Sequence, residues 1–353
     1  MDPIFLKVVV GTTLLASSSA VVGTFSYLKG QSLVGDAIAH ALLPGVVLAF
    51  MLGDGRNPAY LIFGALVSGL IAHYGIEFIQ NRTKLKSDTA VSLVLSTFFG
   101  FGIMLMSVVQ QRGQGQQAGL ERYLLGKAAA ITMLDVYTFS ALALVLLLGV
   151  ALFYKGFQLM TFNEDFAHAI GLPVGLIRVT FTVLTVLAVT IGIQTVGVVL
   201  MAALLITPAA AARAWTKSLP QMIVLAAVFS AISAILGTLI SSAITKMPTG
   251  PWIVIILGLI GFTSLFIAPE KGWLFKRKRA LENRSKTNRE NIMKLMYRQE
   301  EKGGTGNKLS IPQILSIRAM REDALRVGLK DLKKRLWIIE HIDGFALTDL
   351  GRI

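Results

Sequence analysis

Long apolar runs follow one another along the first three quarters of the chain, with short polar stretches between them. A helix needs about 20 residues to cross roughly 30 Å of hydrocarbon. Two shorter runs, 37–53 and 198–213, are rich in glycine, alanine and proline, which is typical of helices packed inside a bundle or broken around a pathway. Together the pattern predicts an all-α polytopic membrane protein with eight to nine transmembrane helices. The runs of full length are 5–28, 58–80, 89–109, 132–154, 176–197, 220–243 and 251–268.

The hydrophobic pattern changes after residue 268. Residues 271–289 are strongly basic and are interpreted as a linker, and three amphipathic segments and a predicted hairpin follow. Three helices and a hairpin is the order of a winged helix-turn-helix, whose third helix would cover about 322 to 336. We therefore predict a transmembrane domain over 1–270, a basic linker over 271–289, and a small cytoplasmic winged-helix-like α+β domain over 290–353.

The composition supports a membrane protein and limits its chemistry. Hydrophobic residues make up 54% and charged residues 15% of the 353 positions, which is far from the balance of a soluble domain. The net charge of +14 follows from basic loops and a basic tail, without any need for nucleic acid. The chain has no cysteine, so a metal handled here would meet carboxylate, imidazole or main-chain oxygen.

Basic residues in the connecting loops predict the orientation. They gather at 82–86, at 155, at 213–217 and at 271–279, which marks these sides as cytoplasmic. The loop over 110–131 then falls outside, although it also carries basic residues. Nine spans would place the N-terminus outside and eight would place it inside. The first apolar run has no basic region before it, so we expect a retained span and not a cleaved signal peptide.

The most specific polar feature is Asp36 with His40, in SLVGDAIAHALLPG. At i and i+4 these residues share one face of a helix, and an ionisable pair in or beside an apolar span is costly and tends to be functional. Carboxylate and imidazole suit divalent manganese, zinc or iron. The alternative is that the two side chains hydrogen-bond each other and hold a helix end. Gly35 and Pro44 flank the pair and would permit close packing and a kink.

Other polar features have simpler interpretations. His73 and Glu77 have the same spacing but lie near Arg82, where we expect a surface ion-pair cluster. Pro208, in LLITPAAAARAW, would kink a helix of small residues near the pathway, although such a segment alone more often serves packing. The sequence contains no HExxH, GxSxG or P-loop motif, so we expect that the chain is not an enzyme and that any energy it uses comes from elsewhere.

A short polar segment, TFNEDFAHAIGLPVG, interrupts the apolar runs at 161–175. Asn163 is placed as an N-cap, Glu164 and Asp165 lie in the first turn, and Gly171 and Pro173 close the helix. Such a helix is either an interfacial connector or a coupling helix that docks in a groove on a soluble partner.

Five sequence blocks resemble, in order and spacing, the permease subunits of bacterial ABC importers for manganese, zinc and iron, over about residues 5–268. The resemblance implies the fold of such permeases in the bacterial inner membrane. It also implies partners: two cytoplasmic ATPase subunits, a second permease copy or homologous permease, and an extracytoplasmic metal-binding protein. The blocks are SLVGDAIAHALLPGVVLAF, KSDTAVSLVLSTFFGFGIMLMS, FNEDFAHAIGLP, QTVGVVLMAALLITPAAAARAW and KMPTGPWIVII.

The resemblance also implies site residues. Asp36 and His40 correspond to the pair that lines the family's translocation path and binds metal, so the metal ion is the transported substrate and no permanent cofactor is expected. The family's coupling segment maps onto Asn163 to Pro173. Within it we expect Glu164, Asp165, Ala169 and Gly171 to contact the ATPase.

The tail resembles the winged-helix domain of metal regulators of the diphtheria-toxin-repressor type. DNA, the ATPase and anionic lipid headgroups are all open as its partner, and we favour a regulatory or protein-contact role.

Two other functions compete with metal import. A permease for a metal chelate, such as a siderophore or cobalamin, shares a similar architecture but would not need Asp36 and His40. A membrane-tethered transcription regulator would explain the tail but not the coupling helix. Carboxylate with imidazole suits manganese, zinc and iron alike, so the choice of metal stays open.

Overall fold

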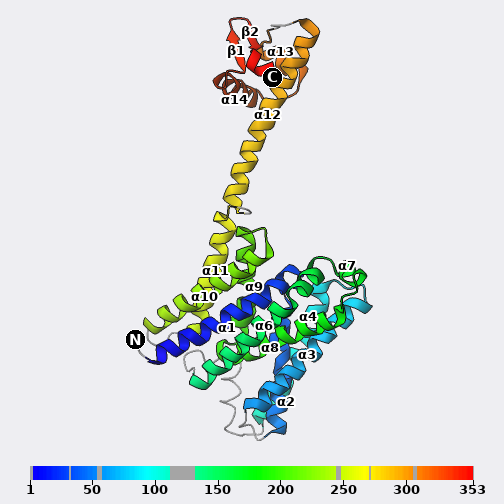
Figure 1. The fold of residues 1–353 in the computed structure, drawn as a ribbon, viewed down its shortest axis with the longest axis vertical. Coiled ribbons are helices and arrows are strands. Elements are labelled where there is room, and N and C mark those ends of the chain that lie inside the picture. The colour runs from blue at the N-terminus through cyan, green and yellow to red at the C-terminus, as the bar shows by residue number, and fades with distance from the viewer. Residues whose placement is uncertain are drawn as a thin grey trace. The chain divides into compact units, whose positions relative to one another are not determined.

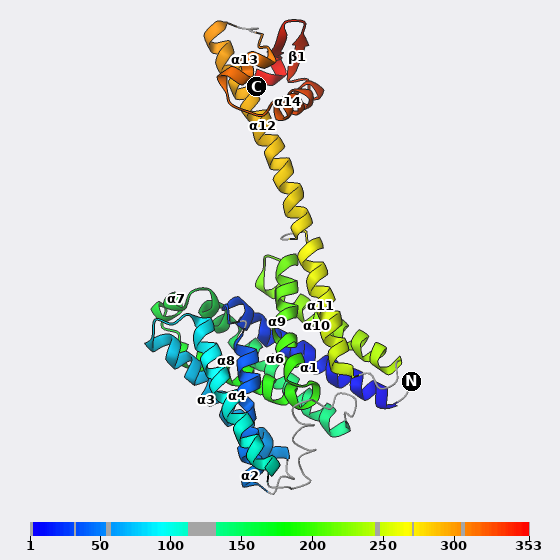
Figure 2. The same ribbon diagram turned by 180° about the vertical axis from the view of Figure 1, so that it is seen from behind.

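The computed structural model describes residues 3–31, 33–53, 58–111, 132–243, 248–269, 272–304 and 308–352. The chain forms two compact units, Met1–Gly272 and Trp273–Ile353, each described by itself (Figures 1 and 2). From residue 112 to 131, the loop predicted to lie on the outer side of the membrane is not among the described residues.

The first unit is built of helices. Among the described residues, eight of them are long and apolar enough to cross a membrane, and a shorter apolar helix covers Met201–Trp215. This confirms the prediction of an all-α polytopic protein with eight to nine spans. The helices are α1 (Pro3–Leu28), α2 (Val34–Leu52), α3 (Pro58–Arg82), α4 (Ser87–Gln111), α6 (Met133–Phe162), α7 (Glu164–Ala169), α8 (Val174–Val196), α9 (Val198–Trp215), α10 (Leu219–Ala243) and α11 (Thr249–Ile267).

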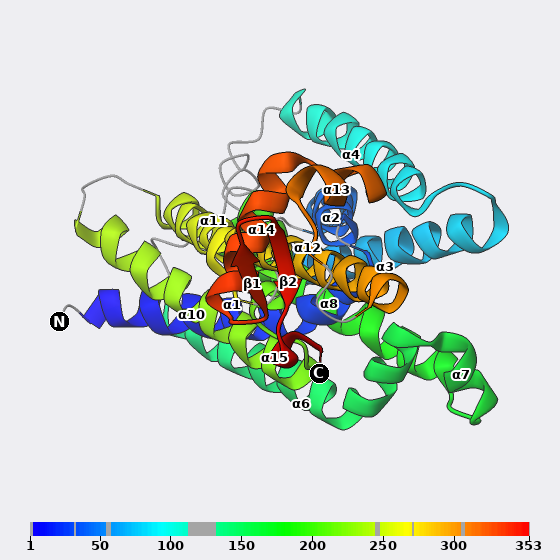
Figure 3. The same cartoon turned by 90° about the horizontal axis from the view of Figure 1, so that it is seen from above.

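The helices differ greatly in the fraction of their apolar span that is buried inside the unit. The α1 helix packs against α6, α9 and α10, and α2 packs between α3 and α4 with α9 behind it. The apolar span of α2 is 72% buried, whereas that of α4 is only 17% buried and lies at the margin of the unit (Figure 3). The helix that carries Asp36 and His40 is therefore largely inside the bundle.

Glycines let two pairs of helices approach backbone to backbone. A Cβ atom on Gly45 of α2 would lie 2.1 Å from the carbonyl oxygen of Gly64 on α3, and a Cβ on Gly23 of α1 would lie 1.7 Å from the carbonyl oxygen of Leu205 on α9. Close contact at small residues is how helices associate in a membrane, where no hydrophobic effect drives them together.

Both predicted prolines lie inside helices that continue through them. Pro44 is in α2 and Pro208 is in α9. Proline has no amide hydrogen, so each removes one i→i−4 hydrogen bond. In α2 the hydroxyl of Ser68, on α3, donates to the carbonyl oxygen of Ala41 at 2.6 Å. The neighbouring helix thus donates a hydrogen bond to a main-chain carbonyl close to the proline.

The second unit has its own core. Its helices α12 (Trp273–Gly303), α13 (Ile311–Ile317) and α14 (Glu322–Lys334) are followed by the antiparallel strands β1 (Ile338–His341) and β2 (Gly344–Leu347) and by α15 (Asp349–Arg352). Ile292, Ile314, Leu325 and Leu332 are fully buried and pack together. The predicted third helix corresponds to α14.

Two features of the tail bear on its predicted organisation. Part of the predicted basic linker over 271–289 is helical: residues 273–289, which contain neither glycine nor proline, form the first part of α12. The boundary between the units accordingly lies at Gly272. The sheet of the described tail has two strands, and this small sheet does not by itself support the winged-helix assignment, which stays a prediction.

Candidate metal site

Asp36 and His40 lie in the first two turns of α2 and face the same way. His40 Nε2 is 3.7 Å from Asp36 Oδ1, and the two side chains are 30% and 41% exposed. This separation is too long for a direct hydrogen bond. In this structure the pair therefore does not hold the helix end by bonding to itself, and both groups are open to a ligand.

Neighbouring helices fix the position of the pair. The His40 ring meets Phe99 of α4 edge to face, with 5.0 Å between ring centroids. Behind the pair, Gly35 packs closely against α9, because a Cβ atom on Gly35 would lie 2.6 Å from Leu205 Cδ2. These contacts place the pair on a largely enclosed helix, where both side chains remain partly exposed.

One copy of the chain supplies an incomplete metal site. Within the described parts of the chain, no group of three or more histidine, cysteine, aspartate or glutamate side chains could together hold a metal ion. A transition-metal ion takes four or more ligands. Further ligands would have to come from water, main-chain oxygen or another chain.

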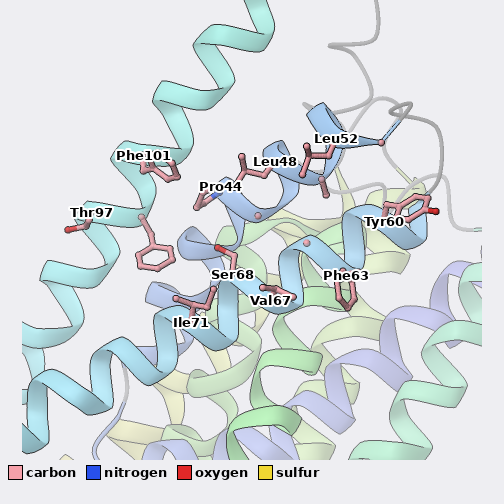
Figure 4. Close-up of a pocket in the computed structure, with 15 residues that line it drawn as sticks. Pro44, Leu48, Leu52, Tyr60, Phe63, Val67, Ser68, Ile71, Thr97 and Phe101 are labelled. Atoms are coloured by element: carbon pink, nitrogen blue, oxygen red, sulfur yellow. The ribbon is translucent and has the colours of Figure 1, made fainter.

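An apolar groove begins next to the pair, between α2, α3 and α4 (Figure 4). Its volume is about 990 Å³, and Pro44 lies on its wall. Among the described residues that line it there is no carboxylate, imidazole or amine, so they do not form a metal site. Phe63 and Tyr60 stand 67% and 62% exposed beside it. The side chains labelled there are Pro44, Leu48, Leu52, Tyr60, Phe63, Val67, Ser68, Ile71, Thr97 and Phe101.

The short helix predicted at 163–173 is present as α7. Asn163 caps it, because its Oδ1 accepts a hydrogen bond of 2.9 Å from the amide of Phe166. Glu164 and Asp165 form the acidic first turn, where negative charge is favourable. Gly171 ends the segment with a φ of +79°, a conformation that suits glycine, and Pro173 leads directly into α8.

The exposed surface of α7 is more apolar than expected. Phe166 and Ile170 are 51% and 50% exposed, while Ala167 between them is buried. Asp165, Ala169 and Gly171 are also exposed. Phe166 and Ile170 were not predicted as contact residues, although their i, i+4 spacing in FAHAI is a signal that could have identified them.

Glu164 has a different environment from its neighbours in α7. Its carboxylate pairs with the guanidinium of Arg178 on α8, and each side chain is about one third exposed. The ion pair ties the beginning of α7 to α8. Arg178 was missed because its partner lies beyond the reach of a local sequence pattern.

The expectation of a surface ion pair at His73 is wrong. His73 is only 3% exposed, and its Nε2 lies 3.6 Å from Glu77 Oε1. Its buried Nδ1 has no hydrogen-bond partner among the described residues. The side chain faces the inside of the bundle because α3 turns this face toward its neighbouring helices.

Comparison with known proteins agrees with these features. Residues 1–268 match the ABC 3 transport family. The manganese transport system membrane protein MntC of Bacillus subtilis is 40% identical over 325 residues, which are 92% of this chain and 74% of that protein. The zinc transport system membrane protein TroC of Treponema pallidum is 41% identical over 76% of this chain and 91% of its own. The match to MntC is longer than the 268 residues of the family domain, so it extends into the tail.

Solved structures show the same fold. PsaBC from Streptococcus pneumoniae, in complex with Fab, has a TM-score of 0.68 and 32% sequence identity, and the match covers 78% of this chain and 96% of that one. An ABC transporter described as of metal-chelate type, in an inward-facing conformation, has a TM-score of 0.55 at 13% identity over 74% of this chain and 85% of that one, which shows the fold alone. The family match over the whole membrane unit establishes that this chain is a multi-pass membrane protein belonging to the ABC 3 transport family of permeases.

Proposed function

We propose that this chain is the membrane permease of an ATP-binding-cassette importer that moves divalent manganese, zinc or iron into the cytoplasm of a bacterium. The observation that carries the proposal is the geometry of Asp36 and His40, whose side chains are partly exposed on a helix that is 72% buried, with His40 Nε2 3.7 Å from Asp36 Oδ1. Relatives named for manganese, zinc and chelated iron transport support this cargo.

A second permease copy, or a homologous permease, completes the path. Asp36 and His40 provide two ligands, and exposing them to lipid would be costly. Covering this face of α2 with a second chain removes the ionisable pair from lipid and can bring a second pair of ligands to the same ion. The exposed aromatic side chains beside the groove suit such a contact or the surrounding lipid.

The energy comes from two ATPase subunits on the cytoplasmic side, because the chain carries no P-loop of its own. The exposed side of α7, with Phe166, Asp165, Ala169 and Gly171, is the surface that docks on an ATPase subunit. Glu164, paired with Arg178, holds this surface to α8. A metal-binding protein delivers the ion from the opposite side of the membrane. Alternating access then follows from movement of α7 and the helices packed on it.

Transport of a metal chelate is the second candidate for the cargo. It is favoured by a relative in Yersinia pestis named as a chelated iron transport membrane protein, which is 35% identical over 263 residues. A chelate carries its own ligands, so its import would not depend on Asp36 or His40.

The tail is proposed to act on the cytoplasmic side as a regulatory or protein-contact module. It is a separate compact unit with its own buried core. Binding of DNA through a winged-helix surface is the alternative for this unit, supported only by the order of its helices and strands.

Uptake by the complete importer in liposomes tests the proposal. Isotopically labelled manganese, zinc and iron are supplied with wild-type permease or with Asp36→Asn or His40→Gln, at equal membrane abundance. Asp343→Asn and His341→Gln, both exposed in the tail, are the matched controls. We expect the two α2 variants alone to lose uptake of the same ion. Uptake of an iron chelate that persists in both variants would instead favour chelate transport.

A further inference from the structure

Lys29 stands where α1 passes into α2. The turn is closed by hydrogen bonds from the amide of Gln31 to the carbonyl of Ser26 and from the amide of Gly30 to the carbonyl of Tyr27, each 3.1 Å. Gly30 has a φ of +71°, which ends the helix in the manner of a Schellman motif. The amide of Val34, where α2 begins, donates to the carbonyl of Gln31 at 3.2 Å, so Lys29 is linked to the start of α2 through hydrogen bonds of the described residues.

The Lys29 side chain lies over an aromatic cluster. Its Nζ is 5.3 Å from the centroid of the Phe181 ring on α8. Phe181 meets Phe157 of α6 edge to face, and Phe157 meets Phe25 of α1 in the same way, both with centroids 5.6 Å apart. Packing on this cluster restricts where the ammonium can go.

The ammonium shares a polar pocket of about 340 Å³ with Glu77, Glu164 and Arg178. We call these four residues the Lys29 cluster. Lys29 directly follows α1, and the other three come from α3, from the first turn of α7 and from α8. The Glu164 carboxylate pairs with the Arg178 guanidinium, and Glu77 Oε1 lies 3.6 Å from His73 Nε2. The cluster therefore joins the proposed docking helix to the turn that precedes α2.

The charge of Lys29 is not explained by stability. Burial lowers the pKa of Lys29, and the attraction of Glu164 and Glu77 opposes this only in part, while Arg178 adds to the lowering. A lowered pKa for an ammonium group means that its surroundings, taken together, disfavour the charge. A partly buried charge without a gain in stability is a reason to look for a role in function.

We propose that Lys29 is a positioning residue that couples α7 to α2. Its ammonium, held over Phe181 in the pocket that Glu77 and Glu164 also line, transmits displacement of α7 to the α1–α2 turn and so to the helix that carries Asp36 and His40. The inference rests on the proposed function, because it requires α7 to meet the ATPase and α2 to hold the ion.

The first test measures the number of ions imported per ATP hydrolysed by the complete importer in liposomes, with manganese, zinc and iron as the probes. We expect Lys29→Met to lower this ratio at least about fivefold. Fivefold is the smallest effect that a typical coupling free energy between two sites produces. Lys29→Arg keeps the positive charge and is expected to restore most of the ratio. Lys7→Met, at the other end of the same helix, is the control and leaves it unchanged.

Thermal unfolding of the same variants separates coupling from folding. Since the surroundings disfavour the charge, Lys29→Met is expected to unfold at the same temperature as wild type or higher. A wild-type ratio in Lys29→Met would overturn the proposal. So would a lowered unfolding temperature in both Lys29→Met and Lys29→Arg, because the residue would then be structural.

A second readout does not depend on the cargo. The chain has no cysteine, so Leu33→Cys, half exposed in the turn before α2, accepts a single fluorescent label. We expect ATP to change the emission of this label when Lys29 is present and not in Lys29→Met. A label that responds equally in both would refute the coupling role even if metal is transported, whereas absent metal uptake with a Lys29-dependent response would refute only the proposed cargo.

Discussion

Pro44 lies one helical turn beyond His40 in α2, and it removes the amide donor that an α-helix would offer to the His40 carbonyl. The next carbonyl along the helix, that of Ala41, accepts a hydrogen bond of 2.6 Å from the Ser68 hydroxyl. The histidine of the candidate metal site thus has a main-chain oxygen beside it that is relieved of its normal helical bond. Main-chain oxygen is a suitable additional ligand for manganese.

Replacing Pro44 by alanine should weaken ion binding without harming the fold. The new amide can bond to the His40 carbonyl, so this oxygen is withdrawn from the ion. We expect the apparent KM for the transported ion to rise about tenfold, as for other groups that support a metal site, with no loss of thermal stability. Pro251→Ala, in the first turn of α11 where no donor is required, is the control. An unchanged KM in Pro44→Ala would contradict the role of this carbonyl.

Gly45→Ala should destabilise the membrane unit. The added methyl group meets the carbonyl of Gly64 at 2.1 Å, so α2 and α3 must move apart, at a cost of about 1–3 kcal/mol. The measurement is thermal unfolding in detergent. Gly258→Ala, in α11, is the matched control, since no described atom lies within 4 Å of its new Cβ atom. Equal unfolding temperatures for the two variants would show that the helices separate more easily than this contact indicates.

Phe166 should anchor the ATPase on α7. An exposed aromatic side chain in the centre of a docking surface often contributes about 2 kcal/mol or more to binding. We expect Phe166→Ala to reduce co-purification of the ATPase, and Phe166→Leu to retain most of it because apolar contact is preserved. Co-purification that survives Phe166→Ala and Ile170→Ala together would move the docking surface away from α7.

The tail should fold without the membrane unit. Residues 273–353 form a compact unit with a core that includes the fully buried Leu325, so the isolated fragment is expected to unfold cooperatively when followed by circular dichroism. Leu325→Asp should abolish the transition because it buries a charge. Val327→Asp, on the same helix but 65% exposed, should leave it intact. A fragment without a cooperative transition would show that the tail depends on the rest of the chain.

Much of the secondary structure of this protein can be predicted from its sequence, because it depends on residues that are close together in the chain. The spans are set by runs of apolar residues long enough for the bilayer, and α7 is set by its cap, its acidic first turn and its glycine. The i, i+4 spacing of Asp36 and His40 is enough to put them on one face of a helix, because the period of an α-helix does not depend on what packs around it. The family domain also reaches only to residue 268, where the hydrophobic pattern itself ends.

Only the tertiary structure decided which faces of the helices are enclosed. The spans are apolar on all sides, so periodicity does not tell the side that packs from the side that meets lipid. His73 was expected on the surface and is buried. The residues predicted as a linker are helical from Trp273 onward, as the first part of α12. Lys29, Glu77, Glu164 and Arg178 come from four separate elements, and no local pattern connects them. Their meeting depends on how the helices pack, which in turn depends on close contacts such as Gly45 with Gly64.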